Sequence, residues 1–147
     1  MRPIIDGDDN FKIKTLEALI LIQYKSAEKS DVVLKYITKI KQGEGGRRLE
    51  EDLINKSFSF GRTIYSSQKE WYASSIVHDA YHSKLYNDYL ISHSGDVTPD
   101  IWTGEKAEYA CLEYQISFLE EINADKNLVD YAKSLGNENW RDKPVTL

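Results

Sequence analysis

The chain of 147 residues has little of several residue types, and each scarcity excludes a class of protein. One cysteine cannot form an internal disulfide, so we expect a reduced thiol and a cytoplasmic protein rather than a secreted, disulfide-stabilised one. No apolar run approaches the roughly 18 residues that a membrane-spanning helix needs. The first residues also lack the apolar core and the cleavage site of a secretory signal.

The composition that remains is typical of a globular domain. Hydrophobic residues make up 41% and charged residues 29% of the chain, which is enough apolar material for one core. The formal net charge of −5 argues against a general affinity for nucleic acid. We therefore expect residues 1–147 to form a single domain that binds neither nucleic acid nor membranes.

Hydrophobic periodicity predicts a mostly helical α+β fold with a small sheet. Helices are expected from Thr15 to about Tyr24 and over residues 30–42, 68–90, 105–122 and 126–135. Only residues 57–66, SFSFGRTIYS, have the alternation typical of a strand or short hairpin. We expect a lead-in or loop over residues 1–12, 43–48 and 92–104. The polar tail from Asn137 is expected to be loosely held unless Trp140 packs against the domain.

Histidine is the scarce residue with an informative distribution, because His78, His82 and His93 all fall in one short stretch. The first two belong to the helix expected over residues 68–90. Residues four apart on a helix are offset by only about 40° and about 6 Å. Both imidazoles therefore project from one face and can share one metal ion. The competing interpretation is a helix with two satisfied or exposed histidines.

A catalytic zinc site needs a third protein ligand, and the next expected helix offers one. Glu108 shares a helical face with Cys111 and Gln115 by three- and four-residue spacings. A carboxylate on an inward face needs a partner, so Glu108 is the first candidate for the third metal ligand. The alternative interpretation is that Glu108 is an exposed charge on the helix surface. Glu105 and His93 are the alternative candidates for the third ligand. Cys111 is interpreted as a small core residue, with a soft metal ligand as the alternative.

The motif HDAYH, followed 26 residues later by EYACLEYQ, resembles the gluzincin arrangement of zincin-type metallopeptidases. In those enzymes an HExxH helix is completed by a glutamate on a following helix. The resemblance covers about residues 57–120 and is closest to small bacterial metallopeptidase-like domains. The strand-like segment at 57–66 is similar to the edge strand that lines the zincin cleft.

The resemblance implies a hydrolase that binds Zn²⁺ through His78, His82 and Glu108 and acts on peptide substrates. It also implies that Asp79 is the general base that takes a proton from the metal-activated water. The family has glutamate at this position. Aspartate is one methylene shorter, so it must approach the water more closely to act.

Three other classes of protein are compared with the peptidase interpretation on the residues that each requires. A non-catalytic binding or regulatory module that keeps the zincin-like shape, with or without its metal, is the alternative from a different class. Metal-dependent phosphohydrolases of the HD type need an earlier histidine, and none precedes His78. A di-iron carboxylate site in a helical bundle needs repeated Glu-x-x-His pairs, which the sequence lacks.

Overall fold

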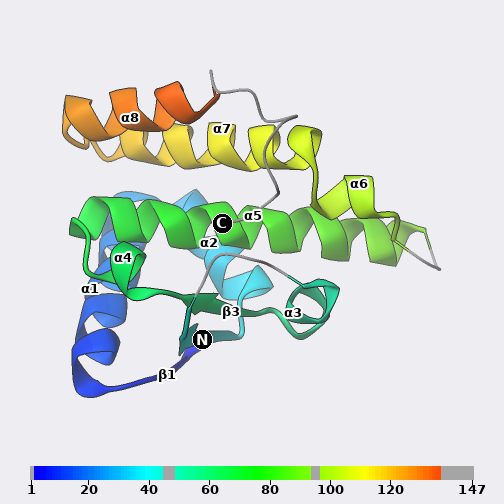
Figure 1. Ribbon diagram of the computed structural model, residues 1–147, viewed down its shortest axis with the longest axis horizontal. Helices are drawn as coiled ribbons and strands as arrows, with labels where there is room; N and C mark the ends of the chain where they lie inside the picture. The colour runs from blue at the N-terminus through cyan, green and yellow to red at the C-terminus, as the bar shows by residue number, and fades with distance from the viewer. Residues whose placement is uncertain (1, 45–48, 94–96, 137–147) are drawn as a thin grey trace.

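The computed structural model describes residues 2–44, 49–93 and 97–136 (Figure 1). Its elements are β1 (Ile4–Asp6), α1 (Asp9–Lys25), α2 (Ala27–Tyr36), β2 (Lys39–Gln42), α3 (Glu50–Asn55), β3 (Ser57–Phe60), α4 (Arg62–Tyr65), α5 (Lys69–Ser92), α6 (Pro99–Trp102), α7 (Glu105–Glu121) and α8 (Lys126–Gly136). The predicted α+β class, mostly helical with a small sheet, is confirmed. Within the described residues, no helix combines the length and apolar character that crossing a membrane requires.

The sheet has three parallel strands in the order β1-β2-β3. Ile5 pairs with Ile40, and Ile40 pairs with Phe58, so these three residues form one row across the sheet. Parallel neighbours need a crossover connection, which α1 and α2 supply between the first two strands and α3 supplies between the last two. Ile40 and Phe58 are buried and belong to the same hydrophobic core as the helices above the sheet.

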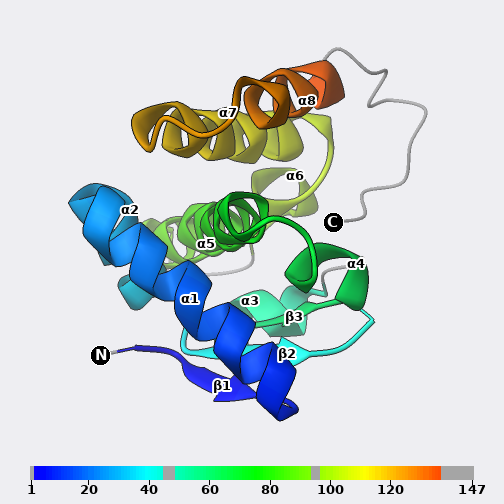
Figure 2. The same cartoon turned by 90° about the vertical axis from the view of Figure 1, so that its left-hand side faces the viewer.

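Helix α5 lies at the centre of the molecule, with the sheet, α1 and α2 on one side and α7 with α8 on the other (Figures 1 and 2). A buried hydrogen bond of 2.7 Å joins the hydroxyls of Tyr72 on α5 and Thr15 on α1. The Ser83 hydroxyl donates to the carbonyl of Tyr36 at the end of α2, also at 2.7 Å. Residues on many sides of α5 are buried, as expected of a helix that other elements surround.

The outer layer, α7 and α8, is tied to α2 by a partly buried ion network. The Lys29 ammonium lies 3.0 Å from a Glu121 carboxylate oxygen and 3.1 Å from one of Glu28. The Ser26 hydroxyl donates to Glu121 at 2.8 Å, and the Tyr114 hydroxyl donates to Glu28. Burial alone would lower the pKa of Lys29, but its two carboxylate partners raise it overall, so the side chain stays charged.

The prediction of a helix over residues 30–42 is wrong at its C-terminal end. Helix α2 ends at Tyr36, and Lys39–Gln42 form the central strand of the sheet. Only Ile40 in this strand is buried, and a single inward residue fits the helical and the strand period equally well. Pairing with two neighbouring strands decides the conformation, and no local pattern reveals that pairing.

The N-terminal segment is more ordered than the lead-in expected over residues 1–12. It contains β1, and α1 begins at Asp9 rather than near Thr15. Asp8 caps this helix, because its carboxylate accepts a hydrogen bond of 2.9 Å from the backbone N–H of Phe11. Asp8 and Asp9 therefore mark the start of the helix inside the segment expected to be a lead-in.

Other local predictions also change. The expected strand over 57–66 ends at Phe60, and Gly61 then starts the one-turn helix α4. A Cβ at Gly61 would lie 2.6 Å from the backbone oxygen of Glu44, so this position needs glycine. The loop expected over 92–104 contains α6. The predictions for residues 45–48 and for the tail from Asn137 lie outside the described residues.

We predict that Ile40→Ala lowers the free energy of unfolding by about 2–5 kcal/mol, because it opens a cavity at a fully buried position of the central strand. The matched control is Ile13→Ala on α1, where the side chain is 59% exposed and the expected change is within about 0.5 kcal/mol. Urea unfolding followed by circular dichroism measures both. Equal losses in the two variants would contradict the central place of β2.

Candidate metal centre

The three side chains predicted as metal ligands meet between α5 and α7. His78 and His82 project from α5, and Glu108 lies in the first turn of α7. One Glu108 carboxylate oxygen is 3.0 Å from His82 Nε2 and the other is 3.3 Å from His78 Nε2. The two Nε2 atoms are 3.2 Å apart. A single point between the helices is therefore surrounded by two imidazoles and a carboxylate.

The orientation of His82 is set by the short helix α6. His82 Nδ1 lies 2.9 Å from the backbone carbonyl oxygen of Trp102. A carbonyl oxygen can only accept, so Nδ1 carries the proton and donates it. In the neutral ring, Nε2 then has a lone pair that faces Glu108. The sequence contains no signal for this contact, because it depends on how α6 folds back onto α5.

A chain of buried hydrogen bonds orients His78. The Ser74 hydroxyl donates to the carbonyl of Trp71 at 2.7 Å and accepts from Gln115 Nε2 at 2.9 Å. This contact places the amide oxygen of Gln115 toward the imidazole, where Oε1 lies 2.8 Å from His78 Nδ1. Nδ1 therefore donates, and Nε2 of the neutral ring faces the carboxylate. Metal-ligating histidines are held by such bonds on the ring nitrogen away from the metal.

The cluster places the negative charge of the Glu108 carboxylate in the protein interior. The side chains of His78, His82 and Glu108 are 5%, 0% and 1% exposed. Burial alone would raise the pKa of Glu108, but its interactions with His78 and His82 outweigh burial and hold the pKa well below its usual range. A buried carboxylate with two imidazole nitrogens turned toward it favours a cation at the centre.

The spacing of these atoms fits a small metal ion. Zinc binds imidazole nitrogen and carboxylate oxygen at about 2.0–2.2 Å, so neighbouring ligand atoms in a tetrahedral site lie about 3.3–3.5 Å apart. The distances among the two Nε2 atoms and the carboxylate oxygens are 3.0, 3.2 and 3.3 Å. Side-chain shifts of a few tenths of an ångström would bring them to coordination distances.

Cys111 joins this cluster from one helical turn after Glu108. Its thiol and one ring nitrogen from each of His78 and His82 all lie within 4.8 Å of one another, and all three residues are buried. This group can hold a metal ion. Cys111 is fully buried, as its interpretation as a core residue predicts, and its position beside the two histidines also fits the alternative of a soft metal ligand.

Asp79 follows His78 on α5 and is buried, at 6% exposure. It lies two helical turns after Tyr72, on the side of α5 that packs against Thr15 of α1. Burial, above all, raises the pKa of the Tyr72 phenol, and the charge of Asp79 raises it further. Asp79 is thus placed next to the histidine pair along the helix, with its charge also acting on Tyr72.

The two alternative third ligands are placed differently. His93 is exposed just past the end of α5, where its ring stacks on Tyr89 with centroids 3.9 Å apart. It lies eleven residues beyond His82, about 16 Å along a helix axis. Glu105 is exposed at the start of α7. Glu108 is the predicted third ligand that contacts the histidine pair.

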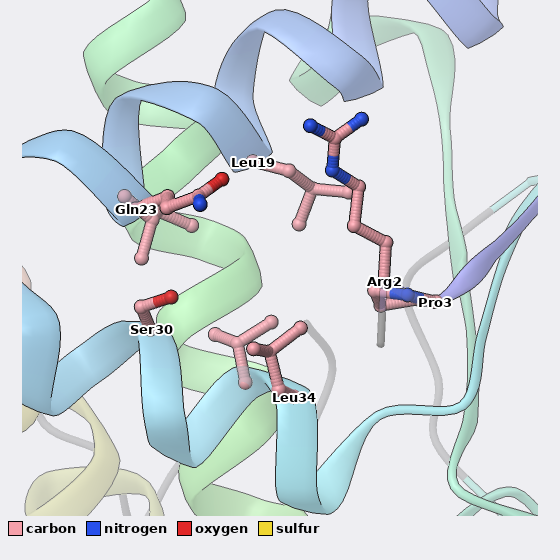
Figure 3. Close-up of a pocket in the computed structure, with 8 residues that line it drawn as sticks. Arg2, Pro3, Leu19, Gln23, Ser30 and Leu34 are labelled. Carbon is pink, nitrogen blue, oxygen red and sulfur yellow. The ribbon is translucent and has the colours of Figure 1, made fainter.

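Concave regions also lie outside the cluster. A cavity of about 190 Å³ lies between α1 and α2, with Leu19 and Leu34 in its wall and Arg2 and Gln23 at its edge (Figure 3). A groove of about 390 Å³ is lined by residues of α5, α6 and α7, including Ala107, which is adjacent to Glu108. The cavity has no lining residue from α5 or α7, whereas the groove is lined by residues of both helices.

Comparisons of the chain with protein-family models, with curated proteins and with solved structures gave no significant match. The geometry of the site therefore carries the functional argument.

We predict that His78→Ala and His82→Ala each weaken Zn²⁺ binding by more than the roughly 10–100-fold that loss of a supporting hydrogen bond costs. Each variant removes a nitrogen ligand, whereas the control His93→Ala changes the remaining histidine and leaves the cluster intact. Competition with a chromophoric chelator measures the affinities. Absence of zinc binding by the unchanged protein, or an equal loss in His93→Ala, would contradict the site.

We further predict that Gln115→Leu weakens Zn²⁺ binding by roughly 10–100-fold, because the His78 Nδ1–H loses its acceptor and the ring loses its fixed orientation. Gln23→Leu is the matched control, since Gln23 is exposed on α1. The same chelator competition applies. An affinity unchanged in Gln115→Leu would show that this hydrogen bond does not prepare His78 for the metal.

Proposed function

We propose that this protein is a zinc-dependent hydrolase of the zincin type that cleaves peptide bonds, with His78, His82 and Glu108 as the metal ligands. One observation carries the proposal. Both imidazoles donate from Nδ1 to fixed acceptors, so that each Nε2 is turned toward one buried carboxylate at 3.0–3.3 Å. This is the preparation that a metal-ligating histidine pair needs.

The proposed mechanism assigns the orientation of the ligands and the transfer of the proton to separate groups of the protein. When bound, zinc supplies a Lewis acid that polarises a carbonyl and lowers the pKa of a water molecule. Gln115 and the Trp102 carbonyl keep the imidazoles in one tautomer and orientation. Asp79, next to His78 in the chain, would accept the proton from the attacking water and pass it to the leaving amine, for which its carboxylate has to turn from the α1 side of α5 toward the cluster. Its short side chain requires the water to lie close to α5.

The substrate has to approach from a side where the cluster can open. His78 is the ligand with the most exposed side chain, at 5%, so the described residues cover the centre almost completely. The groove between α5, α6 and α7 includes Ala107, the neighbour of Glu108 in the chain, and has the apolar residues Leu85 and Ile101 beside the charged Lys106 and Asp100. This mixture suits a peptide, which offers side chains of both kinds together with a polar backbone.

The near-complete burial also favours a second candidate, a non-catalytic module in which the metal only stabilises the fold. Structural zinc sites are closed by four protein ligands, whereas catalytic sites leave a position for water. The cluster contains a fourth donor type in Cys111, and its ligand side chains have little exposure. Zinc content alone does not separate the two candidates, but turnover does.

We predict that the zinc-loaded protein cleaves a mixed peptide library and that Asp79→Asn lowers kcat by about 10²–10⁴-fold while zinc is retained, because the general base is lost. Asp79→Glu, which keeps a carboxylate, should retain activity. Asp31→Asn, at an exposed position of α2, is the matched control. Mass spectrometry of the products measures the rates.

Equal rates for Asp79→Asn and the unchanged protein would exclude Asp79 as the base. A zinc-loaded protein that is more stable than its metal-free form but cleaves nothing in the library would favour the non-catalytic module.

A further inference from the structure

One nucleophilic side chain at the cluster is not used by the proposed mechanism. Cys111 is the only cysteine of the chain and is fully buried. It lies three residues after Glu108, so both side chains leave α7 toward the same face of α5. Its sulfur lies within 4.8 Å of a ring nitrogen of each histidine, and Glu108 lies one turn earlier on the same face of α7.

The distances allow the sulfur to complete a tetrahedron. With zinc–sulfur bonds of about 2.3 Å and zinc–nitrogen bonds of about 2.0–2.1 Å, sulfur and nitrogen ligands lie about 3.6 Å apart. The Cys111 sulfur is within 4.8 Å of a ring nitrogen of both His78 and His82. The required approach is therefore at most about 1.2 Å, which a change of side-chain torsion can supply.

Charge favours the same assignment. Two neutral imidazoles and one carboxylate leave a bound Zn²⁺ with a net charge of about +1 in a site whose ligands have at most 5% exposure. A thiolate as fourth ligand makes the centre neutral, and burial penalises a net charge. Zinc is soft enough to prefer thiolate sulfur and deprotonates a coordinating thiol. The thiol proton is released to the solvent as the metal binds.

We infer that Cys111 is the fourth ligand of the resting metal centre, so that a thiolate fills the position that hydrolysis needs for water. This inference rests on the metal site of the proposed function, and it specifies which ligands the metal has when no substrate is bound. The metal-bound protein would then have a closed centre made by His78, His82, Glu108 and Cys111. Turnover requires the thiolate to leave, and the binding of substrate in the groove between α5 and α7 is the event that can separate these helices.

Titration with Co²⁺ tests the inference without an activity assay. Tetrahedral Co²⁺ absorbs in the visible range, and a thiolate ligand adds a charge-transfer band in the near ultraviolet. We expect both absorptions in the unchanged protein at one equivalent. Because the chain has one cysteine, the ultraviolet band can come only from Cys111, provided that it does not depend on protein concentration. Cys111→Ser should keep the visible absorption, lose the ultraviolet band and bind Co²⁺ at least tenfold more weakly.

The outcomes separate the inference from the proposed function. Visible absorption without the ultraviolet band in the unchanged protein would overturn the role of Cys111 and leave the site of His78, His82 and Glu108 intact. An ultraviolet band that persists in Cys111→Ser would overturn the assignment as well. Failure of the unchanged protein to bind Co²⁺ or Zn²⁺ would contradict the metal site itself. If Cys111→Ser does not fold, the spectrum of the unchanged protein still decides.

Discussion

The contact between α5 and α7 through a buried carboxylate is the interaction on which the rest of the site depends. Glu108 is fully buried, and a charge in that position is tolerated only when groups of opposite or complementary polarity surround it. A cation held between the carboxylate and the two imidazoles would supply them, and each imidazole is oriented by a hydrogen bond from its other nitrogen. Loss of any of these groups leaves a polar atom in the interior without compensation.

The scaffold around this contact explains why it is rigid. Helix α5 is packed by α1 and α2 on one side and by α7 on the other (Figure 2), and the network around Lys29 fixes α7 to α2. The ligand-bearing faces are thereby held in place before a metal binds, which keeps the entropic cost of binding low. The same rigidity would oppose the proposed hydrolysis, because a substrate would need space where the helices now meet. A closed resting centre and an enzyme are compatible only if the helices can separate.

The candidate site was only partly predictable from the sequence. The spacing of His78 and His82 places them on one helical face, and the inward face of the next helix points to Glu108. Gln115 and Cys111 share that face, yet an amide and a thiol are common in ordinary cores, so periodicity does not reveal their roles. The carbonyl of Trp102 has no sequence signature at all, because any residue offers a backbone oxygen.

The long helices and their buried faces are predictable from the sequence, because the 3.6-residue period of apolar side chains is a local property of the chain. The sequence by itself did not determine the central strand at Lys39–Gln42, whose conformation depends on pairing with segments far away in the chain. Only the tertiary structure decided which donors converge on the histidine pair. Convergence follows from how α6 and α7 pack on α5, and packing is a relation between segments that no single segment encodes.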